Sequence, residues 1–259
     1  MKSFSQALIR QTGTFVCMLL VIAPALANEG ALRVSPSRLE FSTDAKSGMV
    51  SLLNEGPERF RLLVTASEWN QNAEGRDIYT KTSDIVFYPK NIILEAGGQQ
   101  VIRVGTRGPS SAREKAYRLI IEETGQPNDP ILKKDENSLR KIGVRSSILI
   151  FVKPRIEQFS GEISNMKLSK GVASVAILNS GSAHVTVTSV SLRGTAADGK
   201  ELLNREFAGW YLLSGASGTY QTDIPRDICK GLARLDSEVT SDKYTLKKSL
   251  EVRKEMCSL

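Results

Sequence analysis

The stretch "RSSILIFVKP", residues 145–154, decides how the rest of this chain is interpreted. Its apolar run from Ile148 to Val152 is unbroken and rich in β-branched residues, which favour a β-strand. A strand with one face in water alternates apolar and polar residues, and this run does not. Both faces therefore need a cover, because an exposed run of this kind promotes aggregation.

Composition describes an ordinary soluble protein. The chain has 259 residues, 41% of them hydrophobic and 24% charged, enough for one large or two ordinary domains. The net charge of +7 falls to +5 once the two cations of the first 27 residues are set aside. Such a mild excess fits either a solvated surface or an attraction to acidic partners. No basic run is interleaved with aromatic residues, so a nucleic-acid partner is not expected.

The N-terminus carries the pattern of a secretory signal peptide. Lys2 and Arg10 precede an apolar run at 15–23, and Ala25-Leu26-Ala27 supplies a cleavage site. Residues 1–27 are therefore predicted to be removed on export. No later stretch approaches 18 apolar residues, so membrane insertion is not expected.

Two cysteines, Cys229 and Cys257, remain after the signal peptide. In an oxidising compartment a disulfide is their simplest fate, and it would contribute about 3–4 kcal/mol. A metal site lacks ligands, because His184 is the only histidine and there is no Cys-x-x-Cys.

The chain repeats one pattern at a distance of 125 residues. "VSLLNEGPERFRLLVTA" (50–66) and "VAILNSGSAHVTVTSVS" (175–191) each place Leu-Asn-x-Gly between two strand-like runs. Asn54 with Gly56, and Asn179 with Gly181, are expected to turn the chain because Asn and Gly tolerate positive φ. Two similar β domains would produce such a repeat.

The remaining sequence alternates short strands with turns, and helical periodicity is nowhere sustained. We predict an all-β fold of two immunoglobulin-like sandwiches, at 28–154 and 155–259. The expected strands are 32–41, 49–54, 60–69, 84–94, 100–106, 115–122 and 142–152, then 172–178, 184–193, 210–213, 219–224, 232–239 and 245–253.

Patterns typical of catalysis are missing. A nucleophilic triad could use only His184, which sits in an alternating run like an ordinary strand residue. No glycine-rich phosphate loop follows a strand, and the carboxylates are scattered. We therefore expect neither an enzyme nor a cofactor.

Several stretches together resemble the periplasmic chaperones of the chaperone–usher pilus pathway, especially their archaic branch. The matching segments, which cover most of residues 32–154, are "VSPSRLEFS" (34–42), "VSLLNEG" (50–56), "SEWNQ" (67–71), "DIVFYPKNIILEAGGQQVIRVGTR" (84–107), "EKAYRLIIEE" (114–123) and "RSSILIFVKP" (145–154). The resemblance implies two domains in an L and an ATP-independent chaperone that lends a strand to incomplete pilus subunits. It also implies an outer-membrane usher as the second partner.

This resemblance suggests what covers the apolar run. One face would belong to the chaperone's core and the other to the subunit, by strand addition at a sheet edge. Matching the terminal "KP" to the family's strand end assigns the subunit-facing side chains to Ile142, Val144, Ile148 and Ile150. Replacing Ile148 by Asp is then expected to abolish subunit binding without unfolding the protein.

The family also holds the subunit's terminal carboxylate with basic residues between the domains. Arg38 matches the arginine of the family's first strand, but the family's lysine position falls on Leu149. We expect replacement cations among Arg103, Arg118 and Arg145, since guanidinium suits a carboxylate.

One alternative remains open from the residues: an exported structural or adhesive sandwich, such as a pilus subunit or carbohydrate-binding module. Self-association through the free strand edge is a further fate to be considered. The particular subunit, usher and pilus type are not specified by these residues.

Overall fold

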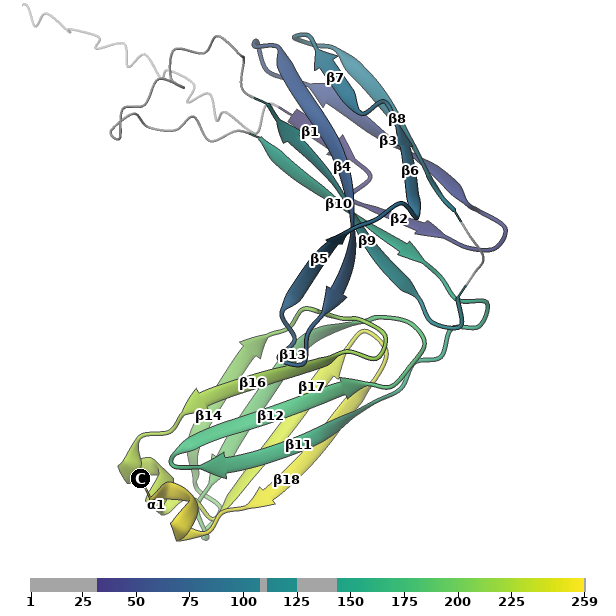
Figure 1. The fold of residues 1–259 in the computed structure, drawn as a ribbon. Coiled ribbons are helices and arrows are strands. Elements are labelled where there is room, and N and C mark those ends of the chain that lie inside the picture. Colours follow the sequence, from purple (N-terminus) through teal and green to yellow (C-terminus); the bar gives the residue numbers. More distant parts are fainter. Residues whose placement is uncertain (1–31, 108–110, 125–143, 259) are drawn as a thin grey trace, which may run out of the picture.

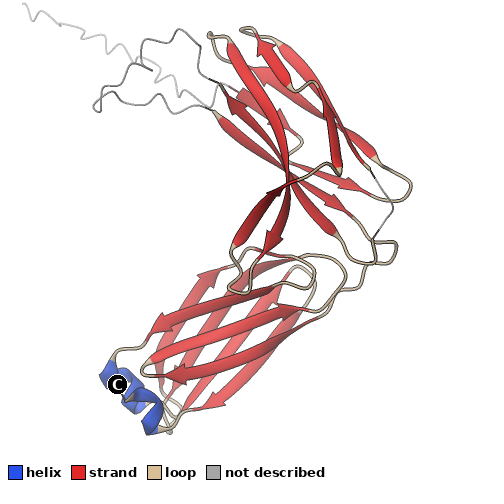
Figure 2. Ribbon diagram, in the orientation of Figure 1, coloured by secondary structure: helices blue, strands red, loops and turns tan. Residues whose placement is uncertain are grey.

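The computed structural model describes residues 32–107, 111–124 and 144–258; the predicted signal peptide lies outside them. Two β-sandwiches meet at an angle (Figure 1). In the described chain the only helices are the short α1 (Arg226–Gly231) and the 3-10 turn η2 (Lys254–Cys257), both at the far end of the second sandwich (Figure 2). The predicted all-β class with two immunoglobulin-like domains is confirmed.

The first sandwich contains two sheets. One has the order β1-β3-β8-β6, and the other has the order β2-β10-β9-β4-β5 with β7 also paired to β4. Their bounds are β1 Leu32–Ser35, β2 Arg38–Phe41, β3 Ser47–Asn54, β4 Phe60–Gln71, β5 Asp77–Lys81, β6 Ile85–Tyr88, β7 Asn91–Leu94, β8 Gln99–Thr106, β9 Lys115–Glu123 and β10 Arg145–Val152.

Two expected strands are each divided by a proline. The stretch 32–41 breaks at Pro36 into β1, which joins one sheet, and β2, which joins the other. The stretch 84–94 breaks at Pro89 into β6 and β7 in the same way. Proline has no N–H to give to a ladder, so the chain can change sheets there.

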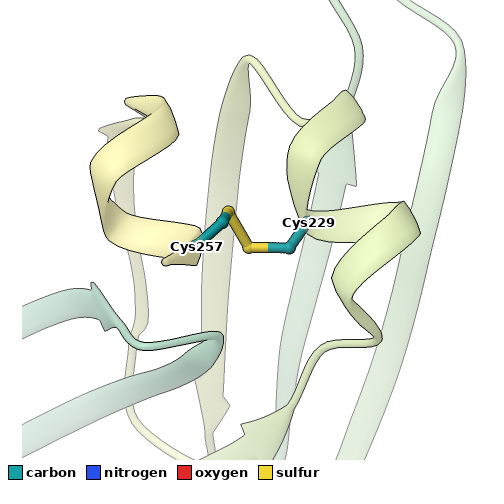
Figure 3. The surroundings of a disulfide bond; sticks show 2 residues. All are labelled: Cys229 and Cys257. Carbon is teal, nitrogen blue, oxygen red and sulfur yellow. A yellow bond between two sulfur atoms is a disulfide. The ribbon is translucent and has the colours of Figure 1, made fainter. Parts of the chain in front are cut away.

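The second sandwich packs a sheet β11-β12-β16 against a sheet β14-β13-β17-β18, with β15 paired to β13. Its strands are β11 Gly161–Ser169, β12 Val172–Asn179, β13 Val185–Thr195, β14 Glu201–Ala208, β15 Tyr211–Leu212, β16 Ser217–Asp223, β17 Arg234–Ser241 and β18 Thr245–Glu251. The predicted disulfide is present: Cys229 of α1 and Cys257 of η2 are joined, with their Cα atoms 5.7 Å apart (Figure 3).

The two repeated asparagines act through their side chains. Asn54 and Asn179 are fully buried at the ends of β3 and β12. The Asn54 amide donates to three backbone carbonyls and the Asn179 amide to two, while each Oδ1 accepts the N–H of the glycine two residues later. The expectation of positive φ is wrong, because neither residue of these Asn–Gly pairs adopts it.

Candidate functional site

Strand β10 has one edge that is only partly covered. It pairs with β9 along its whole length, but with β2 only from Leu149 to Val152. Glu123 donates its N–H to the Val144 carbonyl, so in the antiparallel alternation 144, 146 and 148 bond to β9. The backbone groups of Arg145 and Ser147 then point to the other side, where the described residues supply no strand. A short segment of sheet edge is left available there.

The side chains of β10 divide differently from the sequence expectation. Ile148 and Ile150 are 1% and 0% exposed and lie inside the first sandwich's own core. Their assignment to a face reserved for a subunit is therefore wrong in this structure. Val144 is half-buried against the same core, and Ile142 lies outside the described residues.

The opposite face of β10 is covered by the second sandwich. Phe151 is fully buried and shares a cluster with Trp69, Ala116 and, from the second sandwich, Leu213. His184 stacks on the Phe151 ring with 3.9 Å between centroids, and its Nδ1 lies 2.6 Å from Glu114 Oε1. The apolar run of β10 thus lies between its own core and the neighbouring domain.

On the face of the sheet that carries Leu149 and Phe151, one row of cross-strand partners runs from β2 to β5. Leu149 lies opposite Arg38 of β2 on one side and opposite Arg118 of β9 on the other. Ser67 of β4 and Lys81 of β5 continue the same row. Cross-strand partners have Cβ atoms about 5 Å apart, so Arg38 and Arg118 flank Leu149 on one face. We call Arg38, Leu149, Arg118, Ser67 and Lys81 the cationic row.

Arg118 is held by aromatic rings. Its Cζ lies 4.2 Å from the ring centroid of Trp69 and 5.9 Å from that of Tyr79, distances that allow a cation–π attraction. Its Nε is buried without a hydrogen-bond partner. Among the described residues no carboxylate oxygen lies within 4.0 Å of this guanidinium, so its charge has no acidic neighbour at contact distance.

Arg38 and Lys153 share one acidic neighbour, Glu40. The Arg38 guanidinium lies 3.1 Å from Glu40, while Lys153 Nζ lies 2.7 Å from the same carboxylate and 3.6 Å from Glu157. The Lys153 hydrogen bond holds the pKa of Glu40 below its usual value, and the same bond raises the pKa of Lys153. Glu40 is thus largely matched by Lys153, and Arg38 keeps part of its charge for another anion.

The other two predicted arginines lie elsewhere. Arg103 is exposed on β8, in the sheet on the opposite side of the sandwich, so its assignment to a shared anchor is wrong. Arg145 shares the face of the row but bonds Glu122 at 2.9 Å. It precedes Leu149 by four residues, roughly 13 Å along a strand. The structure therefore brings together Arg38 and Arg118 alone.

Trp69, Tyr79 and Lys153 were not predicted as site residues. Trp69 is buried at the junction of the two sandwiches. The alternation 149, 151, 153 along β10 was the available signal for Lys153. Tyr79 lies on β5, a strand that was not predicted, so nothing marked it.

Two sandwiches joined at an elbow, with an incompletely paired strand edge beside the cationic row, define a two-domain immunoglobulin-like protein. Residues 31–156, which include the whole first sandwich, match the family model "Pili and flagellar-assembly chaperone, PapD N-terminal domain". This match does not favour the alternative of a pilus subunit or carbohydrate-binding module.

A curated relative is the "Probable fimbrial chaperone EcpE" of Escherichia coli O127:H6, 28% identical over 165 residues. The match covers 59% of this chain and 66% of the relative, slightly less than two thirds of its length.

Solved structures share the fold. The YadV chaperone has a TM-score of 0.53 at 16% identity, over 85% of this chain and 99% of that one. A CsuC–CsuE chaperone–subunit complex from the archaic Csu pili of Acinetobacter baumannii has a TM-score of 0.51 at 16% identity, over 73% of this chain and 89% of that one.

Over the part of the chain that the structure describes, no helix is long and apolar enough to cross a membrane. In the same residues no group of three or more metal-ligating side chains occurs.

Proposed function

We propose that this protein is a periplasmic chaperone that binds, folds and caps fimbrial subunits by donor-strand complementation and delivers them to an outer-membrane usher. The unpaired edge of β10 at residues 145–148 carries the proposal, because its free backbone groups can form a ladder with a strand of another chain. The similarity to a fimbrial chaperone and to the chaperone of a chaperone–subunit complex supports it.

The chain's parts take the following roles. Residues 1–27 direct export, residues 28–154 form the donor domain, and residues 155–259 form the second domain. Ile142 and Val144 provide the apolar side chains that enter the subunit. The protein is not an enzyme and needs no nucleotide, because the folding of the subunit itself supplies the driving energy.

Arg38 and Arg118 bind the subunit's terminal carboxylate. Both flank Leu149, and Arg118 lacks an acidic neighbour at contact distance among the described residues. In this proposal an arginine on the adjacent strand replaces the family's usual lysine, and this departure supports assignment to the archaic branch. Guanidinium–carboxylate hydrogen bonds contribute roughly 1.5–3 kcal/mol each, so losing either arginine should weaken binding about 10- to 100-fold.

The experiment is co-expression with a fimbrial subunit in a bacterial periplasm, followed by isolation of the one-to-one complex. Arg38→Ala and Arg118→Ala should reduce its yield and increase subunit degradation. Arg103→Ala is the matched control, since that arginine is exposed on the opposite sheet. Equal loss in all three variants, or in none, would contradict the assigned anchor.

The edge is tested separately by Ser147→Pro. This change removes the N–H that points to the open side and leaves the bonds to β9 in place. The free chaperone should remain folded and lose the complex. A normal complex would show that the edge of β10 does not pair with the subunit.

A further inference from the structure

The orientation of Arg118 depends on Trp69. The guanidinium lies over the indole at 4.2 Å, and its buried Nε has no hydrogen-bond partner to orient it. Tyr79, on the neighbouring strand, is 47% exposed and more distant at 5.9 Å. Trp69 is therefore the closer of the two aromatic contacts that set how the guanidinium is presented to the cationic row.

Trp69 in turn contacts the second sandwich. It is 1% exposed, and the ring of Tyr211 from β15 meets it edge-on with 5.7 Å between centroids. Phe151 of β10 lies beside both, 6.0 Å from Trp69 and 5.8 Å from Tyr211. Without Tyr211, the indole would lose the aromatic ring that the second sandwich packs against it and would keep only the aliphatic contacts of their shared cluster, such as Leu213.

Gln71 sets the position of Tyr211. It lies two residues after Trp69 on β4, so both side chains project from the same face of the sheet. Its Nε2 donates to the Tyr211 carbonyl at 2.8 Å, and its Oε1 accepts the Leu213 N–H at 3.0 Å. One side-chain amide thus pairs with two backbone groups of the second sandwich, as a peptide group of a neighbouring strand would.

We infer that Trp69 and Tyr211 are positioning residues for the carboxylate anchor: the docked second sandwich fixes the guanidinium of Arg118 through the Trp69 ring. The second domain therefore contributes to subunit affinity through Arg118, in addition to any surface it offers directly. This inference rests on the proposed function, in which Arg118 binds the terminal carboxylate.

The test uses the full chain and a 12-residue peptide of alternating valine and threonine, made with a free C-terminal carboxylate and as its amide. The measured quantity is the ratio of the two dissociation constants. We expect the unmodified protein to prefer the carboxylate about tenfold, Arg118→Ala to abolish the preference, and Tyr211→Ala to reduce it severalfold. In the double variant, Tyr211→Ala should have no further effect on the ratio.

Three variants separate positioning from general destabilisation. Tyr211→Phe keeps the ring and should restore the preference. Phe207→Ala removes another half-buried aromatic of the second sandwich, whose ring contacts Tyr220 and not Trp69, and should leave the ratio unchanged. Gln71→Met breaks the two bonds from the first sandwich to the backbone of Tyr211 and Leu213, and it should lower the ratio even if Tyr211→Ala fails to fold.

A second readout needs no peptide. The Nε–H resonance of Arg118 should be shifted by the Trp69 ring current, and this shift should shrink in Tyr211→Ala and Gln71→Met but not in Phe207→Ala. Loss of preference in Arg118→Ala with full preference in both Tyr211→Ala and Gln71→Met overturns the inference and leaves the anchor intact. An unchanged preference in Arg118→Ala overturns both.

Discussion

Ile148→Asp should unfold the first sandwich, whereas Ser147→Asp, one residue earlier, should leave it folded. The two positions face opposite sides of β10. Ile148 is 1% exposed within the core, and Ser147 is exposed on the face of the cationic row. The two variants therefore place the same carboxyl group at neighbouring positions of one strand, in the core in one case and on the exposed face in the other.

The cost of Ile148→Asp can be worked from this burial. Truncating a buried isoleucine costs about 2–5 kcal/mol. A carboxyl group at the same place must stay protonated, and raising its pKa from about 4 to about 7 costs roughly 4 kcal/mol at neutral pH. The total of about 6–9 kcal/mol matches the entire stability of a typical domain, 5–15 kcal/mol.

Urea unfolding followed by far-ultraviolet circular dichroism measures both variants. Ile148→Asp should show no folded baseline for the first sandwich, and Ser147→Asp should unfold within about 0.5 kcal/mol of the unmodified protein. A cooperative transition of Ile148→Asp within 1 kcal/mol of the unmodified protein would refute the placement of Ile148 in the core. The sequence-based expectation of a folded variant without subunit binding would then be restored.

Other stability measurements test separate parts of the chain. Asp84→Asn weakens the 2.7 Å hydrogen bond from buried Tyr117, so urea unfolding at pH 7 should show a loss of about 1 kcal/mol. That bond lowers the pKa of Asp84, so it stabilises the folded protein only while Asp84 is ionised. The difference in unfolding free energy between the variant and the unmodified protein should therefore vanish as the pH falls below about 4 and on through the folded-state pKa. An equal difference at pH 2 would contradict this. Cys229→Ser with Cys257→Ser should destabilise the second sandwich alone by about 3 kcal/mol in calorimetry, and a shift of the first sandwich's transition would argue against it. Asn179→Ala, which removes three buried hydrogen bonds between the amide and the backbone, should cost about 3 kcal/mol by urea unfolding; a loss under 1 kcal/mol would mean that water replaces the amide.

The two-sandwich fold was predictable because strand alternation and turn residues are local signals. Strand β5, which was not predicted, lacks these local signals. The β5 segment "DIYTK" is exposed or half-buried throughout, so its sequence carries no apolar alternation. It forms a strand because β4 extends beyond the sheet and offers a partner from Ser67 to Gln71. Such pairing is a property of the tertiary structure.

The site was only partly predictable for a similar reason. Period-2 geometry correctly separated Ile148 and Ile150 from Leu149 and Phe151, yet it could not say which face would be the core. That choice depends on where the second sandwich docks, and Phe151 is covered by residues more than thirty positions away in sequence. Arg38 was assigned from the resemblance to the family's first strand and Arg118 from its residue type, and their meeting beside Leu149 could be seen only from the strand order.

The residue at which β2 begins constrains the direction of any strand that is added to β10. Because β2 begins at Arg38 opposite Leu149, any added strand along residues 145–148 occupies the same line and must stop there. A terminal carboxylate arrives beside Arg38 and Arg118 only if that strand runs in the direction of β10. In the proposed complex, the start of β2 would therefore fix the register of the subunit strand. One extra residue before the subunit's C-terminus would turn all side chains of that strand to the opposite face.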